Sequence, residues 1–249
     1  MITNNERSVL ITGAGGGLGS ALLKRYIGAE IPVVAITGKA SLRIPLCHSD
    51  SRKITIYSCD LMSDESTNST IFKLKNHDFQ AVFFCHGGPI ISSNDPSKIY
   101  SELRAVLRLN FESIVQLIEG LIEQLIISKA TICAVSSISG MESQGNPAYS
   151  AAKSALIAYT RSLGRYVSKN ETSMFCVSPG AFHVEGGYWT NIKKLDKQKY
   201  DDFVDNRMSA GRIADVDEVA NFIFSLACAA TPYIAGNNFV FDGGQGRGF

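Results

Sequence analysis

The sequence lacks the marks of membrane proteins, metalloproteins and nucleic-acid-binding proteins. No apolar run approaches the roughly 20 residues that a membrane-spanning helix needs. The six cysteines and four histidines show no CxxC pair and no ligand spacing, so we expect free thiols and neither disulfides nor a metal site. The formal net charge is only +1, which gives no basis for a nucleic-acid partner or for electrostatic binding to a membrane.

The N-terminus also lacks the apolar core of a signal peptide. Residues 1–7 (MITNNER) lead directly into an apolar segment at 8–12. Together with the free thiols, this predicts a cytoplasmic protein. The 249 residues contain no internal repeat or linker, and they are enough for one large domain that spans 1–249.

What the sequence does contain is an alternation of short apolar strands and longer helices. Strands are expected at 8–12, 33–36, 54–57, 81–84, 131–135, 174–177 and 238–241, and helices at 18–27, 64–75, 100–127, 147–168, 195–207 and 216–229. Continuous apolar strands between helices indicate a parallel sheet covered on both faces. The predicted fold class is therefore α/β, a single doubly wound Rossmann-type domain with a central parallel sheet of about seven strands.

A glycine-rich turn, TGAGGGLG at 12–19, joins the first strand to the first helix. Glycines at this junction let the backbone approach a pyrophosphate, and the free N–H groups of the helix N-terminus attract phosphates. A plain structural turn is the weaker interpretation at this place in the chain. The residues expected to contact a dinucleotide here are Gly13, Gly15, Gly17, Leu18 and Gly19.

The end of the second strand bears on which nicotinamide cofactor binds. An acid there would bond the adenosine ribose and repel a 2′-phosphate, but the position is Thr37. Lys39 and Arg43 follow and could contact a phosphate, unless they are solvated loop charges. NADP(H) is therefore preferred and NAD(H) stays open. After the third strand, Asp60 and Leu61 are expected beside the adenine, although Asp60 could simply begin the next helix.

The strongest chemical signal is a tyrosine and a lysine four residues apart. Tyr149 and Lys153 would project from one face of a helix, and an ammonium near a phenol lowers the phenol's pKa toward neutrality. Two serines, Ser136 and Ser137, end a central strand, where ligands bind in open parallel sheets. A strand-end serine pair and a core tyrosine would be the purely structural interpretation.

Taken together, these motifs resemble those of the short-chain dehydrogenase/reductases over essentially the whole chain. Beyond residues 12–19 and YSAAK at 149–153, the similarity covers Asn110 in LNF, the triplet SPG at 178–180, GR at 211–212 and FDGG at 241–244. The resemblance implies that Tyr149 is the general acid in reduction and the base in oxidation. It also implies that Lys153 binds the nicotinamide ribose and that Asn110 holds a water linking Lys153 to solvent.

The family's spacing leaves the catalytic serine open between two positions. Ser137 lies three residues before Gly140, as in the family's SSxxG, and we prefer it. The usual distance to the tyrosine instead indicates Ser136.

Two departures from the family pattern concern the cofactor. The usual NNAG after the fourth strand is CHGG at 85–88, where Gly87 would keep the backbone thin beside the cofactor. His86 would lie near the adenosine side, more plausibly as an ordinary loop histidine than as a catalytic one. After Pro179 and Gly180, both expected at the cofactor, Val184 replaces the threonine that meets the carboxamide, so a backbone group would make that contact.

The substrate is the least determined feature. Residues 182–212 are expected to form a substrate lid, in which Trp189 either walls the substrate or packs the lid itself. We expect a small polar carbonyl or alcohol substrate, such as a keto-sugar. A 3-oxoacyl thioester on an acyl carrier protein is the alternative, and a non-catalytic cofactor-binding regulator is a third hypothesis, disfavoured by the complete catalytic set. The resemblance also implies a homo-oligomer, either tetramer or dimer.

Overall fold

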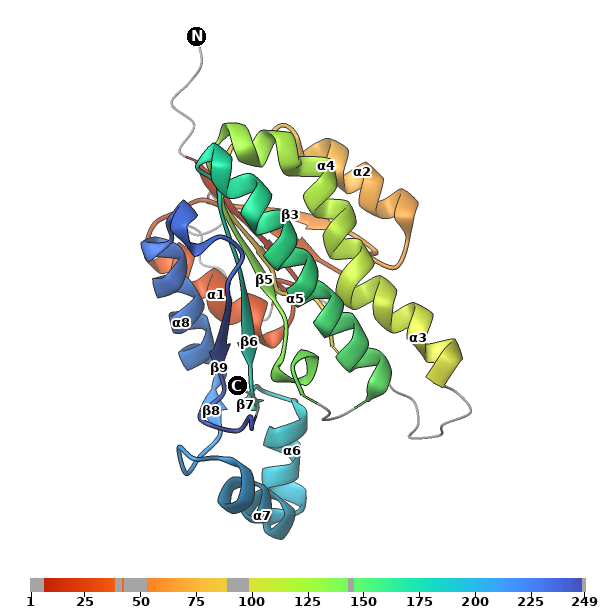
Figure 1. Cartoon of the computed structure of the whole chain (residues 1–249), viewed down its shortest axis with the longest axis vertical. Helices are drawn as coiled ribbons and strands as arrows, with labels where there is room; N and C mark the ends of the chain where they lie inside the picture. The colour runs from red at the N-terminus through yellow and green to blue at the C-terminus, as the bar shows by residue number, and fades with distance from the viewer. Residues whose placement is uncertain (1–6, 39–41, 43–52, 89–98, 143–145, 248–249) are drawn as a thin grey trace.

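The computed structural model describes residues 7–38, 42, 53–88, 99–142 and 146–247 (Figure 1). Its centre is a seven-stranded sheet in the order β3-β2-β1-β4-β5-β6-β9, in which every neighbouring pair is parallel. The strands are β1 (Ser8–Thr12), β2 (Val33–Thr37), β3 (Ile54–Ser58), β4 (Phe79–Phe84), β5 (Thr131–Val135), β6 (Ser173–Pro179) and β9 (Asn238–Phe241). The predicted doubly wound α/β fold is confirmed.

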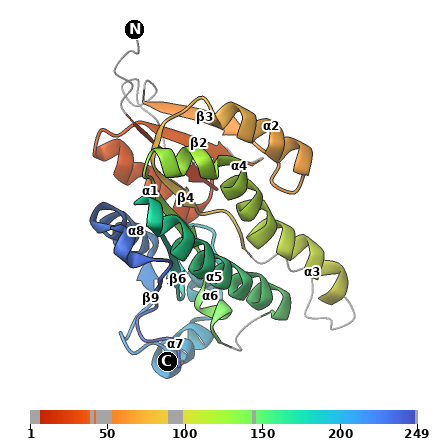
Figure 2. The same ribbon diagram turned by 45° about the horizontal axis from the view of Figure 1, so that its top comes forward.

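Helices cover both faces of the sheet, as Figures 1 and 2 show. One face packs against α1 (Gly17–Gly28) and α8 (Val216–Ala229). The other packs against α2 (Asp64–Leu74), α4 (Ser113–Ile127) and α5 (Pro147–Val167). β1, β2, β5 and β6 are almost wholly buried between these layers, which explains their continuous apolar sequences, whereas the edge strand β3 is partly exposed.

The strand order reverses between β1 and β4, because the chain leaves β1 toward β2 on one side and returns to β4 on the other. In open parallel sheets, ligands bind outside the carboxyl ends of the strands at such a reversal. The glycine-rich turn follows β1 and residues 85–88 follow β4, so both meet at this point.

The helix predicted as continuous over 100–127 is interrupted. It consists of α3 (Ile99–Leu107), a π turn over Arg108–Glu112, and α4. The buried Asn110 lies in the π turn, and its side-chain amide donates to the carbonyl of Val106 at 3.0 Å. Hydrophobic periodicity does not register one extra residue in a turn, so the pattern missed this bulge.

The segment expected as the lid is more structured than predicted. It contains a short helix α6 (Tyr188–Leu195) before the predicted charged helix, which is α7 (Lys197–Arg207). A two-stranded sheet of β7 (Phe182–His183) and β8 (Ala214–Asp215) closes the segment. The ring of Trp189 lies 3.8 Å, centroid to centroid, from that of Phe203, so Trp189 packs the segment's own core.

Among the residues described above, no helix combines the length and apolar character that crossing a membrane requires.

Candidate functional site

Two adjoining cavities lie at the carboxyl ends of the strands, the first at β1, β4, β5 and β6 and the second at β1, β2, β3 and β4. They share Gly16, Cys85, His86 and Gly87. The first has a volume of about 310 Å³, and the second a volume of about 690 Å³. The remaining walls of the first are Gly17, Leu18, Gly88, Val135, Ser136, Ser137, Tyr149, Lys153, Pro179, Gly180, Phe182 and Val184. The two cavities together suit an extended ligand that passes over the backbone of residues 85–87, which lies between them.

The first cavity brings together Ser137, Tyr149 and Lys153. The Asn146 side chain caps α5 by accepting from the backbone N–H of Tyr149 at 3.2 Å, so the tyrosine lies in the first turn of the helix. Its hydroxyl is hydrogen-bonded to the side chain of Ser137. One turn later, the Lys153 Nζ lies 5.6 Å from the Tyr149 ring centroid and donates to the carbonyl of Val135 at 2.9 Å.

The two serines differ in what their hydroxyls do. The Ser136 Oγ is buried and donates to the backbone carbonyl of Lys153 at 3.0 Å, so its hydrogen is committed to holding α5 against β5. The Ser137 side chain is the one bonded to Tyr149, and its oxygen also accepts from the N–H of Ser139 at 3.1 Å. This geometry favours Ser137 as the serine that meets a ligand.

The pKa of Tyr149 is raised and not lowered, contrary to the expectation from Lys153. Burial raises the pKa of Tyr149, and the hydrogen bond from Ser137 only opposes this rise. Burial also lowers the pKa of Lys153 to about 8, against the influence of the nearby thiols of Cys176 and Cys85. Tyr149 is therefore a phenol at neutral pH, which is the form that can donate a proton.

Asn110 stands behind the first cavity and does not line it. Its Oδ1 accepts from the N–H of Gly88 at 2.8 Å, and its Nδ2 donates to the carbonyls of Gly88 and Val106, both at 3.0 Å. Both amide hydrogens are thus occupied. A water linked to Lys153 would have to use the remaining lone pair of Oδ1 or a main-chain carbonyl of the π turn.

Val184 packs directly over the glycine-rich turn. A Cβ at Gly17 would overlap a methyl group of Val184, so the chain after β6 closes on the start of α1. Gly17, Leu18, Pro179, Gly180 and Val184, all expected at the cofactor, therefore lie together in the wall of the first cavity. Gly15 and Gly19 line neither cavity, and a Cβ at Gly19 would overlap the carbonyl oxygen of Gly13 within the turn.

The second cavity contains the predicted adenine-side residues Asp60 and Leu61. Asp60 accepts from the N–H of Met62 at 3.0 Å through one oxygen, which leaves the other oxygen open. The remaining walls are Gly13, Ile36, Gly38, Ser58, Cys59, Met62 and Leu109. Thr37 is buried and does not line the cavity, because it faces inward as the last residue of β2, whereas Gly38 does line it. Lys39 and Arg43 lie outside the described residues.

Several lining residues were missed by the sequence reasoning: Ser58, Met62, Cys85, Leu109 and Phe182. Ser58, Cys85 and Phe182 lie at or just beyond strand ends, so the position of each strand's C-terminus was the available signal. His86 was placed near the cavities, and the structure adds that its side chain is buried rather than loose in a loop.

Comparison with known proteins gives one consistent picture. A family model described as enoyl-(acyl carrier protein) reductase matches residues 13–245. Among curated proteins, the chain is 27% identical to 3-oxoacyl-(acyl-carrier-protein) reductase FabG of Rickettsia typhi, over 98% of this chain and 99% of the relative. It is 23% identical to sorbitol-6-phosphate 2-dehydrogenase of Klebsiella pneumoniae, over 98% and 97% of the two chains.

Solved structures are similar in fold. An L-sorbose reductase from Gluconobacter frateurii, solved with NADPH and L-sorbose, superposes with a TM-score of 0.81 at 18% identity, over 98% of this chain and 97% of that one. An NADPH-dependent 3-quinuclidinone reductase from Rhodotorula rubra gives a TM-score of 0.81 at 22% identity, over 96% and 91% of the two chains.

Proposed function

This chain belongs to the short-chain dehydrogenase/reductase family and is an NAD(P)-dependent oxidoreductase; from that premise we propose that it uses NADP(H) to interconvert a carbonyl group and a secondary alcohol in a small polar metabolite. The observation that carries the proposal is the meeting of Ser137, Tyr149 and Lys153 at one cavity, beside the glycine-rich turn.

The two cavities fit a dinucleotide, because Gly16 and Gly87 leave open backbone where they join. When bound, NADP(H) supplies or accepts the hydride. In reduction, the Tyr149 hydroxyl would give its proton to the carbonyl oxygen as negative charge develops there. Ser137 would donate a hydrogen bond to the same oxygen and fix its position. Lys153, with its ammonium facing the cavity, would bind the ribose hydroxyls and stabilise the phenolate left on Tyr149.

The preference for NADP(H) is supported by the second cavity. Asp60 is the only acidic side chain among the described residues that line it, and Thr37, at the position where an acid would repel a 2′-phosphate, carries no charge. The two similar structures named with NADPH add support. We propose that Lys39 and Arg43 contact the 2′-phosphate.

A titration followed by nicotinamide fluorescence tests this assignment. We expect the wild type to bind NADPH at least tenfold more tightly than NADH. Lys39→Ala and Arg43→Ala should each raise the Kd for NADPH by about five- to tenfold, as loss of a charge-assisted hydrogen bond does, and leave the Kd for NADH unchanged. Lys73→Ala, which removes an exposed charge on α2, is the matched control. Equal losses for both cofactors would contradict the assignment, and a preference for NADH would reverse it.

Two substrate classes are supported by different relatives. The sorbitol-6-phosphate 2-dehydrogenase and L-sorbose reductase support a ketose or polyol, and the FabG relatives support a 3-oxoacyl thioester. An acyl carrier protein is acidic and would need free cations near the site. Three lysines of the lid are partly engaged, since Lys197 pairs with Asp201, and Lys193 and Lys199 lie over the rings of Tyr200 and Tyr188. We therefore place the small polar ketone first.

NADPH consumption with L-sorbose, dihydroxyacetone and acetoacetyl-N-acetylcysteamine separates the two classes. We expect a higher kcat/KM for a ketose than for the thioester. A thioester kcat/KM more than tenfold above that of every ketose would replace the first substrate class with the second.

The rate of reduction should depend on the charge of Lys153. Because the pKa of Lys153 is about 8, almost every molecule carries the ammonium form at pH 6.5, and this form is lost as the pH rises through 8. We expect kcat/KM for NADPH to fall about tenfold for each pH unit above 8. The decrease of kcat with pH should occur at higher pH than the decrease of kcat/KM, because the phosphates of bound NADPH favour the ammonium form of Lys153. A flat kcat/KM from pH 7 to 10 would exclude a role for the charge.

Assembly into a dimer or tetramer is a proposal that rests on the family resemblance, and a cytoplasmic location is a proposal that rests on the N-terminal sequence and the free thiols. Light scattering of the purified protein measures the first, and a single monomer mass at micromolar concentration would contradict it.

A further inference from the structure

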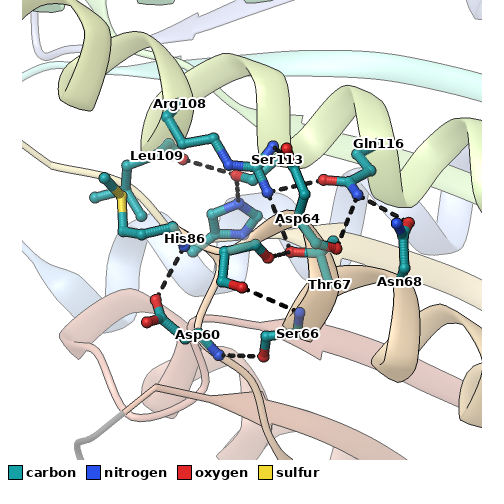
Figure 3. A network of polar contacts seen from close by, with 12 residues as sticks. Asp60, Asp64, Ser66, Thr67, Asn68, His86, Arg108, Leu109, Ser113 and Gln116 are labelled. Carbon is teal, nitrogen blue, oxygen red and sulfur yellow. Dashed lines mark hydrogen bonds and ion pairs between the residues drawn. The ribbon is translucent and has the colours of Figure 1, made fainter.

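His86 connects the sheet to the π turn. Its side chain is 6% exposed, and its two ring nitrogens each have a partner. Nδ1 lies 2.6 Å from the Oγ1 of Thr12, the last residue of β1, and Nε2 lies 2.9 Å from the Oγ of Ser113, the first residue of α4. Figure 3 shows the imidazole pointing at Ser113, and the Arg108 side chain extending toward Thr67 and Gln116.

A neutral imidazole carries one N–H, so one of the two hydroxyls accepts from His86 and the other donates to it. The Ser113 hydroxyl can also donate to the carbonyl of Leu109 at 3.1 Å, and the Thr12 hydroxyl to the carbonyl of Phe83 at 3.3 Å. Whichever hydroxyl accepts from His86 then has a carbonyl acceptor for its own hydrogen. Burial, with the cations of Lys153 and Arg108 nearby, lowers the pKa of His86 to about 3, so the imidazole stays neutral as this arrangement requires. In both tautomers His86 links the end of β1 to the start of α4, directly after the π turn that contains Asn110.

The other end of the same segment is held by Asn110, whose amide binds both the N–H and the carbonyl of Gly88. Gly87 lies between, and a Cβ on it would come within 2.6 Å of the Asn110 Oδ1 and 3.2 Å of the Lys153 Nζ. Residues 86–88 are therefore held at both ends and have no room to shift toward Lys153.

The π turn is also held from α2. Arg108 pairs with Asp64 at 2.9 Å and donates to Thr67 at 3.2 Å and to Gln116 at 2.8 Å (Figure 3). The Arg108 contacts join the π turn to the helix beside the adenine-side cavity, and the His86 contacts join it to the strand that leads into the glycine-rich turn.

We propose that His86 is a positioning residue, which through Thr12 and Ser113 sets the place of Asn110 and of the Gly87–Gly88 backbone between the two cavities. Resting on the proposed function, this inference means that His86 aligns the nicotinamide half of the cofactor with Tyr149 and Lys153 without touching the reacting atoms. His86 would therefore act on kcat more than on the affinity for the carbonyl substrate.

The test compares His86→Leu with His86→Gln, both checked by circular dichroism and thermal unfolding. Leucine keeps the approximate volume and removes both hydrogen bonds, whereas the glutamine amide can donate and accept. We expect His86→Leu to lower kcat at saturating NADPH by tenfold or more, with the KM for the ketone within about threefold, and His86→Gln to recover most of the loss. Normal kcat in folded His86→Leu, or equal loss in both variants, would overturn the proposal.

Ser113→Ala keeps the test available if His86→Leu does not fold. It removes one of the two hydrogen-bond partners of His86 and should lower kcat about three- to tenfold, whereas Thr70→Val, which removes a buried hydroxyl bonded to Ser66 on α2, should leave kcat unchanged. Unchanged kcat in Ser113→Ala would contradict the proposal.

An inactive wild type would refute the proposed function by itself. The emission spectrum of bound NADPH would then test the inference separately. An emission maximum that shifts from wild type in His86→Leu and returns in His86→Gln would support the positioning role, and identical spectra for wild type and His86→Leu would contradict it.

Discussion

Tyr149→Phe should lower kcat for carbonyl reduction by about a thousandfold, within the range for loss of a general acid, while the Kd for NADPH stays within about twofold of wild type. Phenylalanine keeps the partly buried ring at the start of α5 and removes only the proton that Tyr149 would donate and the bond to Ser137. Steady-state kinetics and a fluorescence titration measure the two quantities.

Tyr159→Phe is the matched control for this prediction. Tyr159 lies on the same helix and packs edge-on against Phe111, outside the first cavity. Burial and the nearby Glu119 raise its pKa to about 12, so its hydroxyl is also a phenol at neutral pH. We expect the control to keep kcat near wild type. Near-normal turnover in Tyr149→Phe would refute the proposed proton transfer.

Gly19→Ala should destabilise the protein by about 1–3 kcal/mol, as overpacking does, and raise the Kd for NADPH at least tenfold. The new Cβ would overlap the carbonyl oxygen of Gly13. That oxygen belongs to the backbone of the glycine-rich turn, so the turn must move away from the position in which it lines both cavities. Thermal unfolding should show a Tm lower by about 3–10 °C.

Gly28→Ala separates this steric effect from the general effect of alanine in α1. Nothing lies within 4 Å of a Cβ at Gly28, which ends the same helix. We expect the free energy of unfolding of this variant to rise by up to about 1 kcal/mol, because alanine restricts the unfolded chain. Its affinity for NADPH should be unchanged. Similar losses in both variants would show that the crowding at Gly13 is not the cause.

The fold followed from the sequence because its central strands are buried on both sides and therefore continuously apolar. Segments such as SVLIT at 8–12 and TICAV at 131–135 can occupy few other environments. The structure of the lid was harder to predict, because β7 and β8 are two residues each and pair across 30 intervening positions. Nothing local in the chain marks such a pairing.

The candidate site was predicted where chemistry depends on spacing along one helix. The four-residue interval from Tyr149 to Lys153 places both at the first cavity. The direction of the Tyr149 pKa shift was not predictable, because it depends on burial, which raises it, and on the hydrogen bond with Ser137, which opposes the rise. The role of His86 was missed for a similar reason. Its partners Thr12 and Ser113 are 74 and 27 residues away and come together only when β1 and α4 pack.

The most direct test of the proposed function is to follow the hydride itself. NADPH deuterated at the transferable C4 position would be incubated with the protein and the ketone that gives the highest turnover, and the alcohol would be analysed by mass spectrometry and NMR. We predict one deuterium on the carbinol carbon with the wild type, and a rate of incorporation about a thousandfold lower with Tyr149→Phe. Tight binding of NADPH without transfer of the label to any carbonyl compound tested would contradict the proposal that this protein is a carbonyl reductase.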